Sequence, residues 1–150
     1  MTTEETKKKV KKKIKNEAFQ RNWYLIDAKD KTLGRLSTKI AGILMGKEKA
    51  IFSKDTDKGD FVVVVNVEKI RVTGRKAEDK KYYTHSGYQG GLKIAYYKDL
   101  IKNRPADILE HAVNGMLPKN KLRNNRMKRL KVYAGDTHPH KAQKLEVIEK

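Results

Sequence analysis

One early segment of the chain repeats hydrophobic residues with the spacing of a helix. Between Thr32 and Gly46, the large apolar residues recur at positions that share one helical face. These residues are Leu33, Leu36, Ile40, Ile43 and Leu44. Threonine is a favourable N-cap, and glycine is favourable just beyond a helix C-terminus. The pattern therefore predicts an amphipathic helix that begins after Thr32 and ends before Gly46.

Two apolar segments that flank this helix have the character of buried strands. Trp23–Asp27 precedes the helix, and Phe61–Val65 follows it as one phenylalanine and four valines. A run without polar alternation suits a strand that is covered on both faces, as in a parallel sheet. The order strand, helix, strand predicts a β-α-β unit with a right-handed crossover.

The middle of the chain predicts one strand, a glycine-rich loop and two helices. In residues 80–92 a strand runs into the loop, and one of Tyr82 and Tyr83 faces the core because strand side chains alternate. Residues 96–103 predict a short helix, and Pro105 opens a longer one at its first position. The apolar stripe of the longer helix is Ile108, Leu109, Ala112, Val113 and Met116.

The C-terminal third is predicted to be less regular. Residues 120–130 predict a basic helix, residues 131–133 a short strand, and the chain from Gly135 onward an irregular segment. We therefore divide the chain into a basic arm (1–20), an α/β domain (21–143) and a tail (144–150).

The charge of the chain adds a polyanionic partner to this picture. The 150 residues include 36 Lys and Arg against 18 Asp and Glu, a formal net charge of +18. Nucleic acid is the leading candidate partner, and an anionic membrane surface is the second. The absence of Cys excludes disulfides and a cysteine zinc site. With no apolar run long enough to span a membrane and no signal-peptide pattern, we expect a cytosolic protein without a membrane partner.

Positive charge is concentrated in residues 111–135, which contain seven cations and no carboxylate. The seven cations are Lys119, Lys121, Arg123, Arg126, Lys128, Arg129 and Lys131. A stretch of one sign repels itself unless a polyanion neutralises it. We therefore expect these side chains to contact RNA phosphates, and replacement of Arg126, Lys128 and Arg129 by alanine to weaken binding.

A second candidate surface is the loop of residues 82–91 with its flanking lysines. Glycines let the backbone approach a phosphate closely, and tyrosine or histidine can stack on unpaired bases. The candidates here are Lys80, His85, Gly87, Tyr88, Gly90, Gly91 and Lys93. Further candidates for RNA contact are Lys47, Lys49, Arg75, Lys76, His138 and His140.

Three stretches resemble enzyme or metal motifs but lack essential residues. Gly46-Lys47 resembles the end of a phosphate-binding loop, but Glu48 stands where Ser or Thr is required. The aspartates of residues 55–60 resemble a calcium loop, whose closing Glu is replaced by Asn66. His138-Pro139-His140 has no third ligand at motif spacing. We predict no catalytic residue, metal, cofactor or small-molecule substrate.

Blocks spread along most of the chain resemble the bacterial large-subunit ribosomal protein L13 family. They are Trp23-Tyr24-Leu25-Ile26-Asp27-Ala28, Lys31-Thr32-Leu33-Gly34-Arg35-Leu36, Asp57-Lys58-Gly59-Asp60, Val72-Thr73-Gly74, Tyr82-Tyr83 with His85-Ser86-Gly87 and Gly90-Gly91, Gly115-Met116-Leu117-Pro118, Leu130-Lys131-Val132-Tyr133-Ala134-Gly135, and His138-Pro139-His140 with Ala142-Gln143. The chain departs from the family at Ser53-Lys54-Asp55, where Thr-Pro-His is usual, and at Arg123, where Gly is usual. The lysine-rich stretch from Lys7 to Lys15 is also more basic than the usual family N-terminus.

The resemblance implies both a fold and a role. The fold is a three-layer α/β/α domain with a small, mainly parallel sheet of about four strands. The role is that of a structural constituent of the cytoplasmic large ribosomal subunit, which binds rRNA, joins early in assembly, contacts neighbouring ribosomal proteins and is not an enzyme.

Three other readings remain open from the residues alone. The chain could act as a free regulatory RNA-binding protein, or as a nucleic-acid-processing enzyme with His138 and His140 at its site. A third reading is membrane-surface binding by the basic arm, although Val10 and Ile14 supply little apolar anchor.

Overall fold

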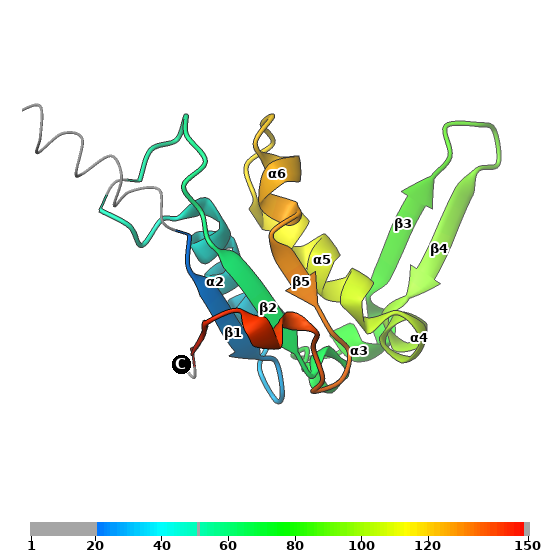
Figure 1. Ribbon diagram of the computed structural model, residues 1–150. Coiled ribbons are helices and arrows are strands. Elements are labelled where there is room, and N and C mark those ends of the chain that lie inside the picture. Colours follow the sequence, from blue (N-terminus) through cyan, green and yellow to red (C-terminus); the bar gives the residue numbers. More distant parts are fainter. Residues whose placement is uncertain (1–20, 51, 149–150) are drawn as a thin grey trace, which may run out of the picture.

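The computed structural model describes residues 21–50 and 52–148, whose arrangement is shown in Figure 1. The strands are β1 (Trp23–Asp27), β2 (Phe61–Val65), β3 (Lys81–His85), β4 (Leu92–Tyr96), β5 (Leu130–Val132) and β6 (Leu145–Val147). The α-helices are α2 (Leu33–Met45), α3 (Lys76–Asp79), α4 (Tyr97–Asn103), α5 (Pro105–Met116) and α6 (Arg123–Met127), and the 3-10 turns are η1 (Val67–Lys69) and η2 (His140–Ala142). The predicted basic arm, residues 1–20, lies outside the described residues. None of the described helices has both the length and the apolar character that a membrane crossing requires.

Four strands form a parallel sheet in the order β5-β2-β1-β6. Trp23 at the start of β1 lies beside Phe61 of β2 on one side and beside Leu145 of β6 on the other. All four valines of β2 are buried. Burial on both faces explains why this run lacks polar alternation. The predicted small, parallel four-stranded sheet is therefore confirmed.

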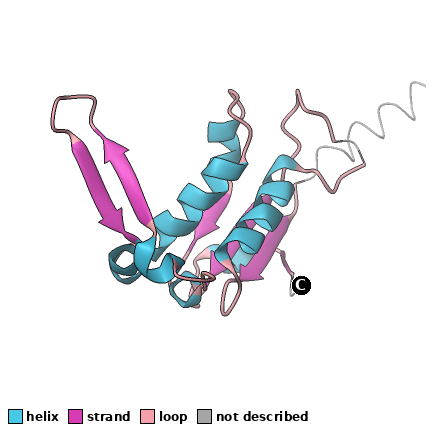
Figure 2. Cartoon of the chain, turned by 180° about the vertical axis from the view of Figure 1, so that it is seen from behind, coloured by secondary structure: helices cyan, strands magenta, loops and turns pink. Residues whose placement is uncertain are grey.

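The main hydrophobic core lies between this sheet and two helices. Ile26 of β1 faces the core together with Val62 and Val64 of β2. The predicted apolar stripe of α2 is buried against them, as are Ile108, Leu109 and Val113 of α5. Figure 2 shows α2 and α5 covering the same face of the sheet.

The ends of α2 follow the predicted boundaries. Gly46 adopts a left-handed conformation with φ 73°, and a Cβ at this position would lie 2.7 Å from the carbonyl oxygen of Lys58. Both features require glycine. Thr32 occupies the N-cap position, but its side chain makes no capping hydrogen bond. Instead, the Leu33 N–H donates to the carbonyl of Arg71 at 2.9 Å.

The opposite face of the sheet is covered by the segment that follows β5. Trp23 and Phe61 project from neighbouring strands on this face, and their rings stack with centroids 4.2 Å apart. His140 of η2 packs against Trp23 at 5.3 Å between centroids. Figure 1 shows this segment crossing β1 and β2. The predicted three-layer fold is therefore confirmed. Its third layer is the segment after β5, which contains the 3-10 turn η2.

The glycine-rich loop leads into a strand that the pattern analysis did not predict. β3 and β4 pair antiparallel, from Lys81 opposite Tyr96 to His85 opposite Leu92. Most of β4 is exposed, so no buried face marks it in the sequence. Tyr82 is half-buried and Tyr83 is exposed, which confirms the predicted alternation.

Two predictions for the C-terminal third are wrong. A helix is predicted over residues 120–130, but α6 extends only over Arg123–Met127, with turns on either side of it. The segment after Gly135 is predicted to be irregular, but it contains β6. This strand extends the sheet into residues 144–150, which are predicted to be a tail. Three residues are too few to show a strand pattern without their distant partner β1.

Candidate nucleic-acid interface

The β3-β4 hairpin projects away from the main sheet and exposes its tip (Figure 1, Figure 2). Gly87 and Gly90 have φ values of 89° and 69°, which L-residues rarely adopt. The Gly87 N–H donates to His85 Nδ1 at 2.9 Å, and Tyr88 is 80% exposed. At Gly91, a Cβ would lie 2.1 Å from Ser86 Oγ. The glycines thus form a tight loop that holds a tyrosine and a histidine at the surface.

One face of this hairpin combines aromatic, imidazole and aliphatic side chains. Tyr83 pairs with Ile94 and His85 with Leu92, and directly paired residues project from the same side of a ladder. All four side chains are exposed. Residues 80–98 contain no carboxylate but several lysines, including the predicted Lys93. Exposed rings beside cations are the chemistry that stacks on unpaired bases and contacts phosphates.

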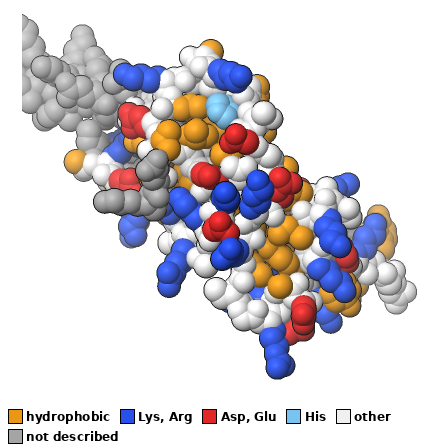
Figure 3. All heavy atoms as spheres, turned by 90° about the horizontal axis from the view of Figure 1, so that it is seen from below, with side chains coloured by type: hydrophobic (Ala, Val, Ile, Leu, Met, Phe, Trp, Pro, Cys, Tyr) orange, Lys and Arg blue, Asp and Glu red, His pale blue; other side chains and the backbone are white. Residues whose placement is uncertain are grey.

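A different end of the molecule carries charges of both signs. Figure 3 shows acidic and basic side chains intermixed on the lower face, near the turns that follow β1 and β2. Arg71 Nη2 pairs there with Asp30 Oδ1 at 2.6 Å. The surface is therefore not uniformly positive.

The acid-free window of residues 111–135 separates into exposed lysines and internally bonded arginines. Lys119, Lys121 and Lys128 are exposed, as is Lys47 just beyond α2, while Lys131 in β5 is half-buried. The three arginines of the window bond to groups of the protein itself. Lys119, Lys121 and Lys128 therefore present their charge to solvent.

Arg126 and Arg129 surround Asp57 inside the domain. Arg129 Nη2 donates to Asp57 Oδ1 at 2.6 Å, and Arg129 Nη1 donates to Asp57 Oδ2 at 2.5 Å. Arg126 Nε lies 3.6 Å from Asp57 Oδ1, and the Arg126 side chain is only 2% exposed. Both guanidinium groups are thus buried and paired within the protein, and the RNA contact predicted for them stays a prediction. Their charges neutralise a carboxylate that the sequence places far from them.

This ion-pair cluster keeps Asp57 ionised and leaves no space at Gly59. Burial would raise the pKa of Asp57, but the hydrogen bonds and charge of Arg129, with the charge of Arg126, lower it below its ordinary value. A Cβ at Gly59 would lie 1.8 Å from the Leu44 carbonyl oxygen and 2.9 Å from Arg129 Nη2. The Asp57-Lys58-Gly59-Asp60 block is therefore a structural junction.

Lys49 and Arg123, both predicted to contact RNA, also bond within the protein. Lys49 Nζ donates at 2.6 Å to an oxygen of Asp60, a buried residue. Arg123 Nε donates to the Pro118 carbonyl at 3.2 Å, and Arg123 Nη2 donates to the Leu117 carbonyl at 3.3 Å. Their charged groups bond to other parts of the protein, and the RNA contacts predicted for them stay predictions.

His138 and His140 belong to an aromatic cluster on the outer face of the sheet. His140 Nε2 and the Tyr133 hydroxyl are hydrogen-bonded at 2.9 Å, and the two histidine rings stack with centroids 6.5 Å apart. Burial, His138 and Lys131 together lower the pKa of His140, which favours the neutral imidazole. Both histidines are half-buried and hold the C-terminal segment against the sheet.

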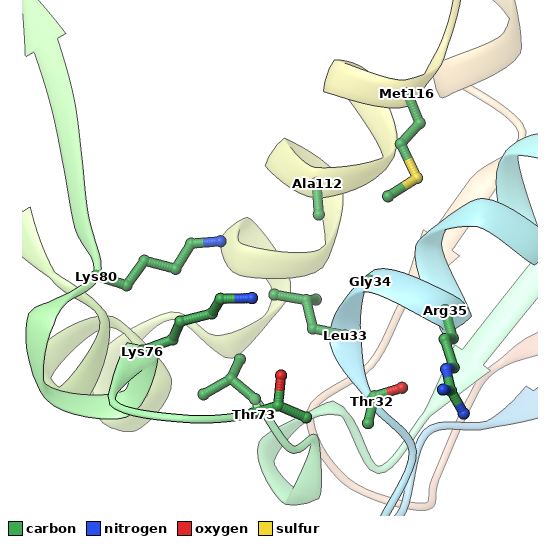
Figure 4. Close-up of a pocket in the computed structure, with 10 residues that line it drawn as sticks. Thr32, Leu33, Gly34, Arg35, Thr73, Lys76, Lys80, Ala112 and Met116 are labelled. Atoms are coloured by element: carbon green, nitrogen blue, oxygen red, sulfur yellow. The ribbon is translucent and has the colours of Figure 1, made fainter.

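A cleft of about 550 Å³ opens between the start of α2, the segment around α3, and α5 (Figure 4). The predicted candidates Lys76 and Lys80 line it, and Arg75 lines an adjoining hollow with them. Met116, which the sequence predicts on the buried stripe of α5, is instead 40% exposed and lines the cleft.

Other polar residues of this cleft carry no signal in the local sequence pattern. Thr32, Arg35 and Thr73 line it, although the predicted site contains none of them. Each belongs to a block that resembles the family, and this resemblance is the only sequence feature that marks these residues as candidates. No local pattern in the sequence shows that these blocks meet in space.

Comparison with known proteins connects these features to one family. The family model described as ribosomal protein L13 matches residues 21–139. The chain is 53% identical over 134 residues to the large ribosomal subunit protein uL13 of Pelobacter propionicus, covering 89% of this chain and 94% of that protein. It is 53% identical over 137 residues to uL13 of Aquifex aeolicus, covering 91% and 95% of the two chains. For uL13 of Geobacter sulfurreducens the identity is 50% over 141 residues, covering 94% and 99%. The chain therefore belongs to the ribosomal protein L13 family.

Proposed function

We propose that this protein is a structural constituent of the large ribosomal subunit in the cytoplasm. It binds large-subunit rRNA, contacts neighbouring ribosomal proteins and supports early assembly of the subunit. The proposal includes no catalytic step, cofactor, membrane partner or small-molecule substrate. Relatives that match over nearly their whole length carry the name large ribosomal subunit protein uL13, which supports this role.

The exposed β3-β4 hairpin is the structural feature that most strongly supports RNA binding. Its strands and tip bear lysines, tyrosines and His85 without a carboxylate, and they project beyond the packed domain. Exposed apolar side chains next to charges of one sign are typical of a surface that binds a partner, because in water neither is stabilised. RNA supplies both phosphates for the lysines and base faces for the rings.

The folded domain then acts as a rigid wedge between rRNA segments. Exposed lysines on the hairpin, at the end of α2 and around α6 neutralise phosphates where RNA strands crowd together. RNA shape, more than a base code, supplies the selectivity of such binding. The buried arginines contribute indirectly, because they hold the loops that carry these lysines.

Sedimentation of a gently prepared lysate through a magnesium-containing sucrose gradient tests this function. The chain is detected by mass spectrometry across the gradient, before and after a moderately high-salt wash. We expect it to follow large subunits and assembled ribosomes at a constant ratio in both runs. Recovery as free protein near the top of the gradient would refute the ribosomal role and favour a free regulatory RNA-binding protein.

A further inference from the structure

Two lysines point into the cleft between α2, α3 and α5 from the same side. Lys76 and Lys80 are one helical turn apart, and Figure 4 shows both side chains reaching across the cleft toward α5. Among residues 21–50 and 52–148, neither lysine forms an ion pair. Lys80 Nζ lies 5.2 Å from the centroid of the Tyr82 ring. The cleft lining itself contains no carboxylate, and Asp79 lines the adjoining hollow with both lysines, so the two ammonium groups leave a net positive site.

The facing wall of the cleft is apolar, and hydroxyl groups lie near its floor. Leu33, Ala112 and Met116 supply the apolar surface (Figure 4). Thr32 and Thr73 also line the cleft, and the Thr32 hydroxyl makes no capping hydrogen bond to α2. A ligand in this space would meet the two lysines on one side, aliphatic groups and Arg35 on the other, and hydroxyls near the floor.

We propose that this cleft receives a single unpaired nucleotide of the large-subunit rRNA. The phosphate lies between Lys76 and Lys80, and the base lies against Leu33 and Met116. This inference rests on the proposed rRNA-binding function and assigns one specific contact within it. The volume of about 550 Å³ falls within the range of roughly 300–1,000 Å³ for sites that enclose small organic ligands.

The mixed lining favours a nucleotide over other occupants. An apolar protein segment in the cleft would desolvate two ammonium groups without a partner, which is costly. A continuous RNA helix would present phosphates but would leave the apolar wall unused. An unpaired nucleotide carries an anion and a flat base in one unit, and single-stranded loops and bulges are where proteins read RNA bases.

Chemical probing of rRNA bound to the full-length protein tests this assignment. A large-subunit rRNA transcript is probed with base- and ribose-reactive reagents, alone and with wild-type protein. We expect protection at one or a few unpaired nucleotides that disappears with Lys76→Ala/Lys80→Ala, while the rest of the footprint remains. Affinity should fall about threefold, since the two lysines share one phosphate and each phosphate contact contributes roughly half a decade at moderate salt.

Two further variants separate the cleft from general charge. Lys69→Ala/Lys102→Ala removes the same charge from exposed positions outside the cleft and should leave the protected nucleotides unchanged. Ala112→Leu extends an apolar side chain into the cleft without altering charge. It should abolish the same protections while leaving the salt dependence of binding as in wild type. Thermal unfolding close to that of wild type confirms that each variant is folded.

Several results would overturn the assignment. An unchanged footprint with Lys76→Ala/Lys80→Ala would exclude the cleft while leaving the rRNA-binding function intact. Protection that survives in folded Ala112→Leu would show that the lysines bind surface phosphates without an inserted base. Saturable binding of free nucleoside monophosphates to the isolated protein, unaffected by added rRNA, would identify a diffusible ligand instead. Failure of the wild-type protein to protect any nucleotide would instead refute the proposed function itself.

Discussion

Arg129 and Asp57, which are 72 residues apart in sequence, form a two-point ion pair that is almost fully enclosed by the protein. Arg129 also donates from Nη2 to the Leu44 carbonyl at 3.1 Å. One guanidinium group thereby joins the end of α2, the loop before β2 and the residue before β5. Arg126 adds a second positive charge to the same carboxylate.

Loss of the Arg129 guanidinium should destabilise the fold strongly. Arg129→Ala leaves Asp57 buried with a weaker partner and leaves the Leu44 carbonyl without this donor. Removal of one member of a buried pair costs about 3–5 kcal/mol of unfolding free energy. Urea unfolding followed by circular dichroism measures this cost. Lys128→Ala, on the exposed neighbour, should change the same free energy by less than about 0.5 kcal/mol. Equal effects of the two substitutions would contradict the internal role of Arg129.

The same cluster should make stability depend on acid pH. The pKa of Asp57 is lower in the folded protein than its ordinary value of 3.8, so folding favours the ionised carboxylate. This contribution is fully present above that value and is lost as the pH falls through the folded-state pKa. Wild type should therefore be more stable than Asp57→Asn at neutral pH, and the difference should shrink below about pH 4. Urea titrations of both proteins across this range provide the measurement, and a difference that does not vary with pH would argue against the ion pair.

The valine strand should not tolerate charge. Val64 has no exposed surface, so Val64→Asp places a carboxylate without a partner in the core and should abolish cooperative unfolding. Val147→Asp provides the control, because Val147 is 62% exposed in edge strand β6. Thermal melts by circular dichroism compare the two. A cooperative melt near the wild-type temperature for Val64→Asp would show that this position is not enclosed.

Exposed lysines should set the salt dependence of RNA binding. Combined replacement of Lys119, Lys121 and Lys128 by alanine should weaken rRNA binding and flatten the plot of log affinity against log salt. The slope should change by roughly 0.7–0.9 for each phosphate contact that is lost. Filter binding over a series of salt concentrations gives the slope, with Lys29, Lys69 and Lys102 replaced together as the control of equal charge. If both triple variants flatten the slope equally, the effect comes from net charge and not from this surface.

Elements with a strong local pattern could be predicted from the sequence. The apolar stripe of α2, its terminal Gly46 and the valines of β2 each carry a signal within a few residues. β4 and β6 carry no such signal, because β4 is largely exposed and β6 is short. Their formation depends on partners, and the partner of β6 is at the other end of the chain.

The candidate interface shows a similar division. The loop at the tip of the hairpin was predictable as a candidate surface because glycines, tyrosines and lysines are adjacent in the sequence. The burial of Arg126 and Arg129 could not be predicted. A count of charges cannot show that Asp57, distant in the sequence, neutralises them. The cleft could not be predicted either, because α2, α3 and α5, which are separated in the sequence, each contribute only part of its lining.

The parallel pairing of β1 with β6 also constrains the order in which the chain folds during synthesis. β1 gains its first neighbour, β2, early in translation, but its other edge stays open until residues 145–147 have been made. An open edge strand can pair with other chains, and contacts between distant segments form slowly. Closure of this edge is therefore a late step, and until then the nascent protein carries an aggregation-prone strand that rapid capture by a binding partner would help to protect.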